Sequence, residues 1–119
     1  MADETPFGRY TYPGRDDVWV QFKAGPYRMR TKREWDDTRD EAKIYAFLMR
    51  YVESWSLKDL DGKAVPVPTF AAEPTEVKEG EVDERIAWAD DIEVSVISFL
   101  ISSFTRLIHL DAARPPKAS

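Results

Sequence analysis

The sequence of 119 residues contains no cysteine and a single histidine, His109. A chain without cysteine cannot form disulfides, thiolate metal sites or a cysteine nucleophile, and it suits a reducing compartment. One histidine cannot assemble a multi-histidine metal site or a histidine relay within one chain. We expect His109 to lie at the end of the last helix, where a partial positive charge would suit the helix dipole.

Sequence motifs for catalysis are missing as well. The chain has no G-x-S-x-G, no glycine-rich phosphate loop and no H-E-x-x-H, which are the patterns of acyl transfer, nucleotide binding and zinc proteolysis. Two acidic pairs, Asp36-Asp37 and Asp90-Asp91, could be considered for glycoside cleavage. Adjacent helical side chains diverge by about 100°, so neither pair would converge on one substrate atom. We interpret both pairs as solvated surface.

A calcium loop is the remaining candidate for chemistry. Asp59 and Asp61 with Gly62 resemble the start of such a loop. In a calcium loop the glycine stands sixth and a glutamate twelfth, whereas here the glycine is fourth and the twelfth residue is Phe70. We therefore interpret this stretch as a plain turn. The sequence predicts no catalytic, cofactor-binding or metal-binding residue, and no enzyme.

Net positive charge is lacking too. The chain carries 17 basic and 22 acidic residues, a formal net charge of −5. Neutralising phosphates needs a basic surface, so this balance argues against nucleic-acid binding. The charge is uneven, because five basic residues and no acidic one lie between Lys23 and Arg33, whereas nine acidic residues lie between Glu73 and Glu93. The two stretches could face each other within the fold, which we favour, or pair between subunits.

What is present fits one small domain. With 43% hydrophobic residues in 13.7 kDa, the chain can bury a single modest core. Residues 1–15 predict an N-terminal arm, or a first short extended piece, that frays over its first six residues. Residues 16–110 predict one α+β domain, and residues 111–119 predict a flexible polar tail. The N-terminus is acidic and lacks the apolar segment of a signal peptide.

The first half of the domain predicts short strands and a long central helix. Val18–Phe22 alternates β-branched and aromatic side chains and indicates a strand, and residues 27–30 could return as a second extended segment. The helix would begin at Thr31 or Thr38, each followed three residues later by a glutamate. Its apolar positions recur every three or four residues: Trp35, Ala42, Tyr45, Leu48, Val52 and Trp55.

A small hairpin is predicted next. Asp61-Gly62 is a turn signal, because glycine accepts positive φ and aspartate can bond its own backbone. Together with Trp55, these two residues form the predicted structural turn. Pro66 and Pro68 cannot donate ladder hydrogen bonds, which would place the second arm at an edge. Residues 69–80 predict a loop.

The last predicted element is a long apolar helix that ends near Leu110. Alternation around Ile92–Val96 would also suit a strand, but roughly 25 residues without glycine or proline are far longer than the usual strand of about five or six. Glu93, Arg106 and several hydroxyl residues argue against a membrane span.

Apolar residues of this helix cover more than one face, whereas a surface helix usually carries a single apolar stripe. The helix is therefore either central in the fold, or it docks a partner or another copy of the chain through its second face, and both can hold if the protein oligomerises. The predicted partner-binding residues are Ile97, Phe99, Leu100, Phe104, Leu107 and Ile108.

The element order and the central stretch resemble the tail assembly chaperones of long-tailed bacteriophages. The residues that carry the match are Val52, Trp55, Asp59, Asp61, Gly62, Pro66 and Pro68. The resemblance implies a non-enzymatic protein of the host cell cytoplasm that needs no cofactor. It would bind the tape measure protein and hand it to tail tube subunits, and a frameshifted product would extend its C-terminus. It implies no nucleic-acid or membrane partner, and a homo-oligomer is possible.

A second hypothesis is a structural virion component, such as a tail or connector protein. The aromatic N-terminal arm, Phe7 to Tyr12, departs from the simplest version of the family pattern and motivates this alternative. The opposed charge stretches motivate it further, since they could join subunits in a particle. The two hypotheses differ in whether the protein remains in finished particles.

Overall fold

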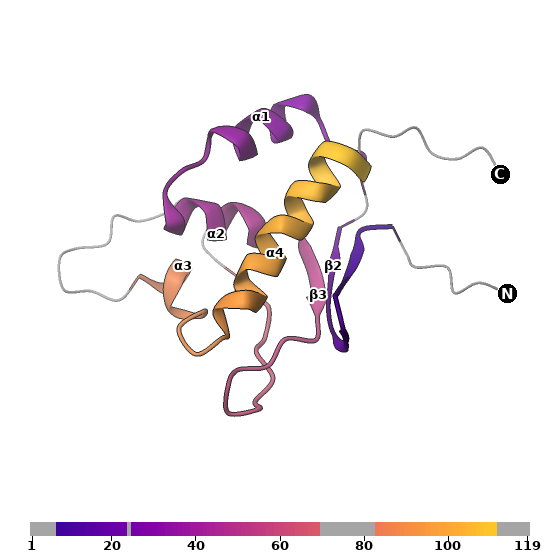
Figure 1. The fold of residues 1–119 in the computed structure, drawn as a ribbon. Coiled ribbons are helices and arrows are strands. Elements are labelled where there is room, and N and C mark those ends of the chain that lie inside the picture. The colour runs from indigo at the N-terminus through magenta and orange to yellow at the C-terminus, as the bar shows by residue number, and fades with distance from the viewer. Residues whose placement is uncertain (1–6, 24, 70–82, 112–119) are drawn as a thin grey trace, which may run out of the picture.

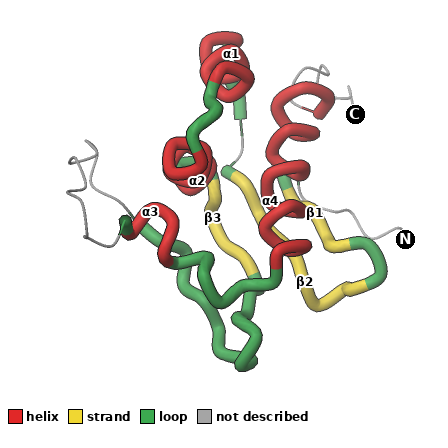
Figure 2. Tube along the Cα trace, turned by 60° about the vertical axis from the view of Figure 1, so that its left-hand side comes forward, coloured by secondary structure: helices red, strands yellow, loops and turns green. Residues whose placement is uncertain are grey.

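The computed structural model describes residues 7–23, 25–69 and 83–111. It contains a three-stranded antiparallel sheet in the order β1-β2-β3, together with helices, which confirms the α+β class. Figure 1 shows the longest helix, α4 (Val94–Arg106), running from the end of the molecule near α3 to the end near α1. Figure 2 shows the strands beside α4, with one end of β3 next to α2.

The sheet begins with a hairpin. β1 (Arg9–Tyr12) pairs with β2 (Arg15–Phe22), and the connecting Pro13-Gly14 has the glycine at φ +81. A proline followed by a glycine of positive φ suits a type II turn. Residues 9–12 are therefore the first extended piece, not a separate arm. The hairpin spans the position between residues 15 and 16 at which the arm was predicted to end.

The strand predicted at Val18–Phe22 is confirmed as the second half of β2. Val18, Val20 and Phe22 are buried on one side, as the alternation requires. Gln21 is also buried, and its polar atoms are satisfied. Its Oε1 accepts from Arg9 Nε at 3.1 Å, while its Nε2 donates to two backbone carbonyls. A buried amide is tolerated because its hydrogen bonds replace those to water.

The predicted long central helix is wrong. The chain forms two helices, α1 (Met29–Asp37) and α2 (Glu41–Met49), and then β3 (Val52–Trp55). The break has a local cause: Asp40 caps α2 by accepting a hydrogen bond from the Lys43 backbone amide, which suits an N-terminus and not a helix interior. α1 begins before Thr31, so the extended segment predicted at residues 27–30 is also wrong from Met29 onward.

The predicted continuous C-terminal helix is interrupted. A short helix, α3 (Glu84–Ala87), is capped by Asp83 and precedes an irregular stretch before α4. α4 ends in a wider π-helical turn, Leu107–Asp111. No strand forms at 92–96 among the described residues, so length was the better criterion there. The predicted loop at 69–80 and the predicted tail at 111–119 lie, except for Thr69 and Asp111, outside the described residues.

The core centres on Phe104 of α4, which is fully buried. Its ring meets Phe22 of β2 at 5.3 Å and Trp35 of α1 at 4.8 Å, measured between ring centroids. Near the middle of α4, Phe99 meets Tyr12 of β1 at 5.4 Å. These pairs bring the helical layer onto the sheet through aromatic contacts, which add geometric preference to the burial of apolar area.

Two tyrosines make the stability of this core sensitive to alkaline pH. Burial raises the pKa of Tyr27 to about 12. Burial also raises the pKa of Tyr10, and the hydrogen bond that its hydroxyl donates to Asp111 adds to the shift. In the unfolded chain tyrosine ionises near pH ~10. Because the folded-state pKa values are higher, this stability is complete below that pH and is lost as the pH rises through them.

We expect denaturant midpoints to fall between about pH 8 and about pH 11, and to fall less in the Tyr10→Phe/Tyr27→Phe double variant. A residual decline should remain, because burial also raises the pKa of Tyr45. Urea titrations at both pH values measure the effect. Equal declines in the wild type and the double variant would show that these two hydroxyls are not responsible.

Candidate protein-binding surface

The six residues predicted to bind a partner are all buried within the chain. They are Ile97, Phe99, Leu100, Phe104, Leu107 and Ile108, with exposed fractions between 0% and 9%. The reason is that the second apolar face of α4 is covered by the chain's own aromatic residues, Tyr12 on one flank and Trp35 on the other. Of the two interpretations of this helix, the central position holds, and these side chains offer no exposed face.

The predicted turn reverses the chain through one aspartate. Asp59 Oδ1 accepts hydrogen bonds from the backbone amides of Asp61 and Lys63, each at 2.9 Å. Gly62 has φ +83 and donates its amide to the Asp59 carbonyl at 3.0 Å. This oxygen therefore serves the turn itself, and no group of three or more potential metal ligands occurs among the described residues.

The two arms of this turn form a single bridge, Lys58 with Ala64, not a longer ladder. The Val65 amide donates to the Leu57 carbonyl at 3.0 Å, and the Asp59 amide donates to the Lys63 carbonyl at 2.9 Å. In this register the odd-numbered residues of the second arm face the first arm. Residues 66 and 68 would direct their amides outward, so prolines at these positions lose no hydrogen bond and block further strand pairing.

A shallow, open groove of about 370 Å³ lies beside this arm. Trp55 supports two of the residues that line this groove. Its Nε1 donates to the Val65 carbonyl at 2.6 Å, and its ring lies 5.6 Å from that of Trp88. Trp88 is fixed in turn by a hydrogen bond from its Nε1 to the Arg85 carbonyl at 2.7 Å. The groove is lined by Asp59, Lys63, Ala64, Val65, Pro66, Pro68, Trp88 and Asp91.

Two exposed apolar side chains lie at the same end of the molecule. Leu60 is 75% exposed and Val94 is 80% exposed. The Leu60 amide donates to the Asp91 carbonyl at 2.9 Å, which ties the turn to the start of α4. We call Leu60, Val94 and the groove together the turn surface. An exposed apolar patch beside a groove is typical of a protein-binding site.

The sequence predicts part of this surface. It predicts that Pro66 and Pro68 lie at an edge and that Trp55 belongs to the turn. Leu60 and Trp88 were missed, although an apolar residue between two aspartates was a usable signal for Leu60. Trp88 had no such signal, because its place beside Trp55 depends on the interruption between α3 and α4.

Charged groups near the turn surface are only partly paired. Arg15 Nη1 lies 3.0 Å from Glu93 Oε2, and Arg85 Nη2 lies 2.8 Å from Asp83 Oδ2. The hydrogen bonds from Arg85 hold the pKa of the Asp83 carboxyl below its usual range. Among the described residues, no basic side chain from 23–33 pairs with an acidic one from 83–93.

His109 lies in the terminal turn of the last helix, as expected, and makes a contact that the sequence did not indicate. Its Nε2 lies 2.6 Å from Asp36 Oδ1 of α1. Asp36 also lies 3.8 Å from Lys32 Nζ, whereas its neighbour Asp37 is exposed. Asp90 and Asp91 are exposed on the connection before α4. The pairs Asp36-Asp37 and Asp90-Asp91 therefore lie on separate elements and do not line a common pocket among the described residues.

Comparison with protein-family models, with curated proteins and with solved structures gave no match. Within the described residues, the segment Val94–Asp111 is long and apolar enough to cross a membrane by length and composition. A core helix meets the same test. The burial of Leu100, Phe104 and Leu107 places this segment in the core of the fold described above.

Proposed function

We propose that this protein is a non-enzymatic tail assembly chaperone of a long-tailed bacteriophage. In this proposal it acts in the host cell cytoplasm, binds the tape measure protein and passes it to tail tube subunits. It contacts the tape measure protein through the turn surface, and α4 supports the fold behind that surface. This relocates the partner contact from the six buried residues of α4 to Leu60, Val94 and the groove.

The observation that carries the proposal is the placement of the residues behind the resemblance. Trp55, Asp59, Pro66 and Pro68 line or support one groove, and the most exposed large apolar side chains, Leu60 and Val94, lie beside it. A chaperone needs exposed apolar surface for a client whose own apolar stretches would otherwise aggregate. A modest patch also suits release, because small interfaces are typical of transient complexes.

The test is co-expression with the tape measure protein encoded by the neighbouring gene. We expect the two proteins to co-purify, and we expect Leu60→Asp/Val94→Asp to reduce the recovered tape measure protein by about tenfold, as for the loss of a central apolar contact worth about 1.4 kcal/mol. Val94 is the first residue of α4, where an acidic side chain suits the helix dipole, so this variant should fold.

Met29→Asp is the matched control. Met29 is likewise the first residue of its helix and is 59% exposed, but it lies on α1, away from the turn surface. The control should co-purify as the wild type does. If wild-type protein leaves the solubility of the tape measure protein unchanged and recovers none of it, the proposal is wrong. Equal losses with both variants would place the contact elsewhere.

A structural virion component is the alternative, and the oppositely charged ends of the molecule favour it because they suit repeated subunit contacts. The N-terminal arm gives it less support, since residues 9–12 form β1, an edge strand that pairs with β2 in the chain's own sheet. Mass spectrometry of purified particles separates the two functions. A chaperone should be missing from finished particles, whereas a structural subunit should be present in many copies.

A further inference from the structure

We propose that copies of this protein associate head to tail, with a basic surface on α1 of one copy against the acidic side of the turn surface on the next. The basic surface consists of Lys23, Arg28, Arg30 and Arg33 around Met29. The acidic side consists of Asp61, Asp90 and Asp91 around Leu60 and Val94. This inference goes beyond the proposed function and does not depend on it. Both use the turn surface, so a second copy and the tape measure protein would compete for Leu60 and Val94.

The basic surface is unneutralised within the described chain. Lys23, Arg28, Arg30 and Arg33 are exposed and take part in no ion pair there. The acidic residues of α1 lie in its second half, and Asp36 is engaged with Lys32 and His109. Positive charge is therefore concentrated at the start of α1, where Met29 is 59% exposed.

The acidic side also carries unpaired charge, although less of it. Asp61, Asp90 and Asp91 are exposed and make no ion pair within the described residues. Lys58 and Lys63 belong to the same turn, but Asp59 and Asp61 balance them. The excess negative charge therefore comes from Asp90 and Asp91, next to the exposed Val94.

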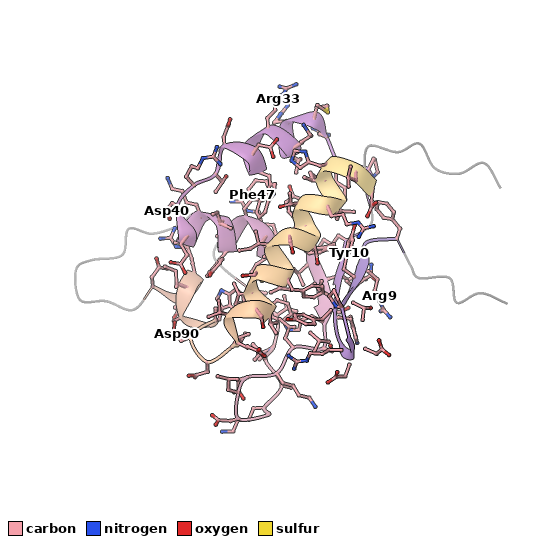
Figure 3. All side chains as sticks on the ribbon, in the orientation of Figure 1. Arg9, Tyr10, Arg33, Asp40, Phe47 and Asp90 are labelled. Carbon is pink, nitrogen blue, oxygen red and sulfur yellow. The ribbon has the colours of Figure 1, made fainter. Side chains whose placement is uncertain are left out.

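The two surfaces lie at opposite ends of the molecule. Figure 3 shows Arg33 pointing away from the body at one end and Asp90 near the other. Figures 1 and 2 agree that α1 and the connection after α3 are far apart. The described parts of one folded chain do not bring them together, and the opposite end of a second copy offers each surface a complement. A contact of this kind is heterologous and extends into a chain or closes into a ring.

The choice of a second copy rests on complementarity in two respects. Each end places exposed apolar area at its centre, Met29 on one side and Leu60 with Val94 on the other. Around that area, one end carries positive charge and the other end carries negative charge. Opposite charges around an apolar centre fix the register of a contact and favour the right partner over a wrong one.

Sedimentation velocity of the full chain tests the proposal. We expect association that depends on protein concentration at about 50 mM NaCl and weakens at least tenfold at about 500 mM, because exposed charges are screened at high salt. Reversing either end, with Arg30→Glu/Arg33→Glu or with Asp90→Lys/Asp91→Lys, should give monomers at the lower salt concentration.

Mixing the two variants is the decisive arm. The first variant then has no net positive charge on its basic surface but keeps its acidic side, and the second is basic at both ends. The unchanged acidic side of the first can bind the unchanged basic surface of the second, so an equal mixture should associate although neither variant does alone. Lys43→Glu/Arg50→Glu, which changes exposed charges of the same sign on and just after α2, should associate as the wild type does. Thermal unfolding followed by circular dichroism should show that all variants remain folded.

The proposal would be overturned by a wild-type chain that stays monomeric at low salt, by association that persists in both reversed variants, or by a mixture that stays monomeric. Loss of association in the α2 variant would assign the effect to net charge and would also overturn it. Co-purification with the tape measure protein is measured separately. A failure here therefore leaves the chaperone proposal standing, and a failure there leaves this one.

Discussion

Replacing Phe104 with alanine should destabilise the fold by about 4 kcal/mol, a large part of the stability of a small domain. The side chain is fully buried and meets rings from the sheet and from both helices that precede β3. Besides Phe22 and Trp35, it approaches Phe47 at 6.2 Å and Tyr51 at 5.4 Å. Alanine would leave a cavity bounded by separate elements, which cannot all move inward to fill it.

Urea denaturation of the wild type and Phe104→Ala measures this cost. Val94→Ala is the control, because it removes apolar atoms from the same helix at a side chain that is 80% exposed. It should change stability by less than about 0.5 kcal/mol. The comparison also separates two roles for α4. If Phe104 served a partner instead of the core, Phe104→Ala would stay as stable as the control.

The fold was predictable where a local pattern matched the final environment. Val18–Phe22 alternates because one side faces the core, so its strand could be read directly. The breaks in both long helices could not be read from spacing alone, since residues three or four apart remain apolar on both sides of a break. Asp40 carries a signal for the first break as the N-terminal cap of α2, but the periodicity around it favours one helix. The break before α4 has no such signal, because Glu93 makes no side-chain capping hydrogen bond.

The candidate site was predictable only in part, for a related reason. An apolar residue in a sequence can be buried by its own chain or left for a partner, and the choice depends on what else packs there. Phe99 and Phe104 looked like surplus apolar area, yet Tyr12 and Trp35 arrive from distant segments to cover them. Leu60 and Val94 have no such cover and remain exposed. Tertiary packing therefore buries the residues predicted to bind a partner and leaves Leu60 and Val94 exposed.

α1 is attached to the rest of the molecule largely through one side chain. Trp35 is the buried residue of this helix. Its Nε1 donates to Thr105 Oγ1 at 3.1 Å, and its ring lies against Phe104 and against Phe47, 5.5 Å away. The only other described side-chain tie from α1 to the last helix is the contact of Asp36 with His109, and half-exposed pairs of this kind contribute little. Local opening of α1 should therefore depend on Trp35.

Replacing Trp35 with alanine should cost about 3 to 5 kcal/mol and should release α1 before the sheet. Hydrogen exchange measures both effects: amides of α1 should lose protection by more than tenfold relative to amides of β2. Thr105→Val is the matched control, because it removes the acceptor of the indole hydrogen bond and leaves the Trp35 ring in place. It also removes the hydrogen bond from Thr105 Oγ1 to the Ile101 carbonyl, and it should cost about 1 kcal/mol. If α1 amides in Trp35→Ala stayed as protected as those of β2, another contact would have to hold the helix. The position of the basic surface would then not depend on Trp35.

If α1 is released, Trp35→Ala should also weaken association between copies at low salt, since Arg30 and Arg33 would no longer be held in one place.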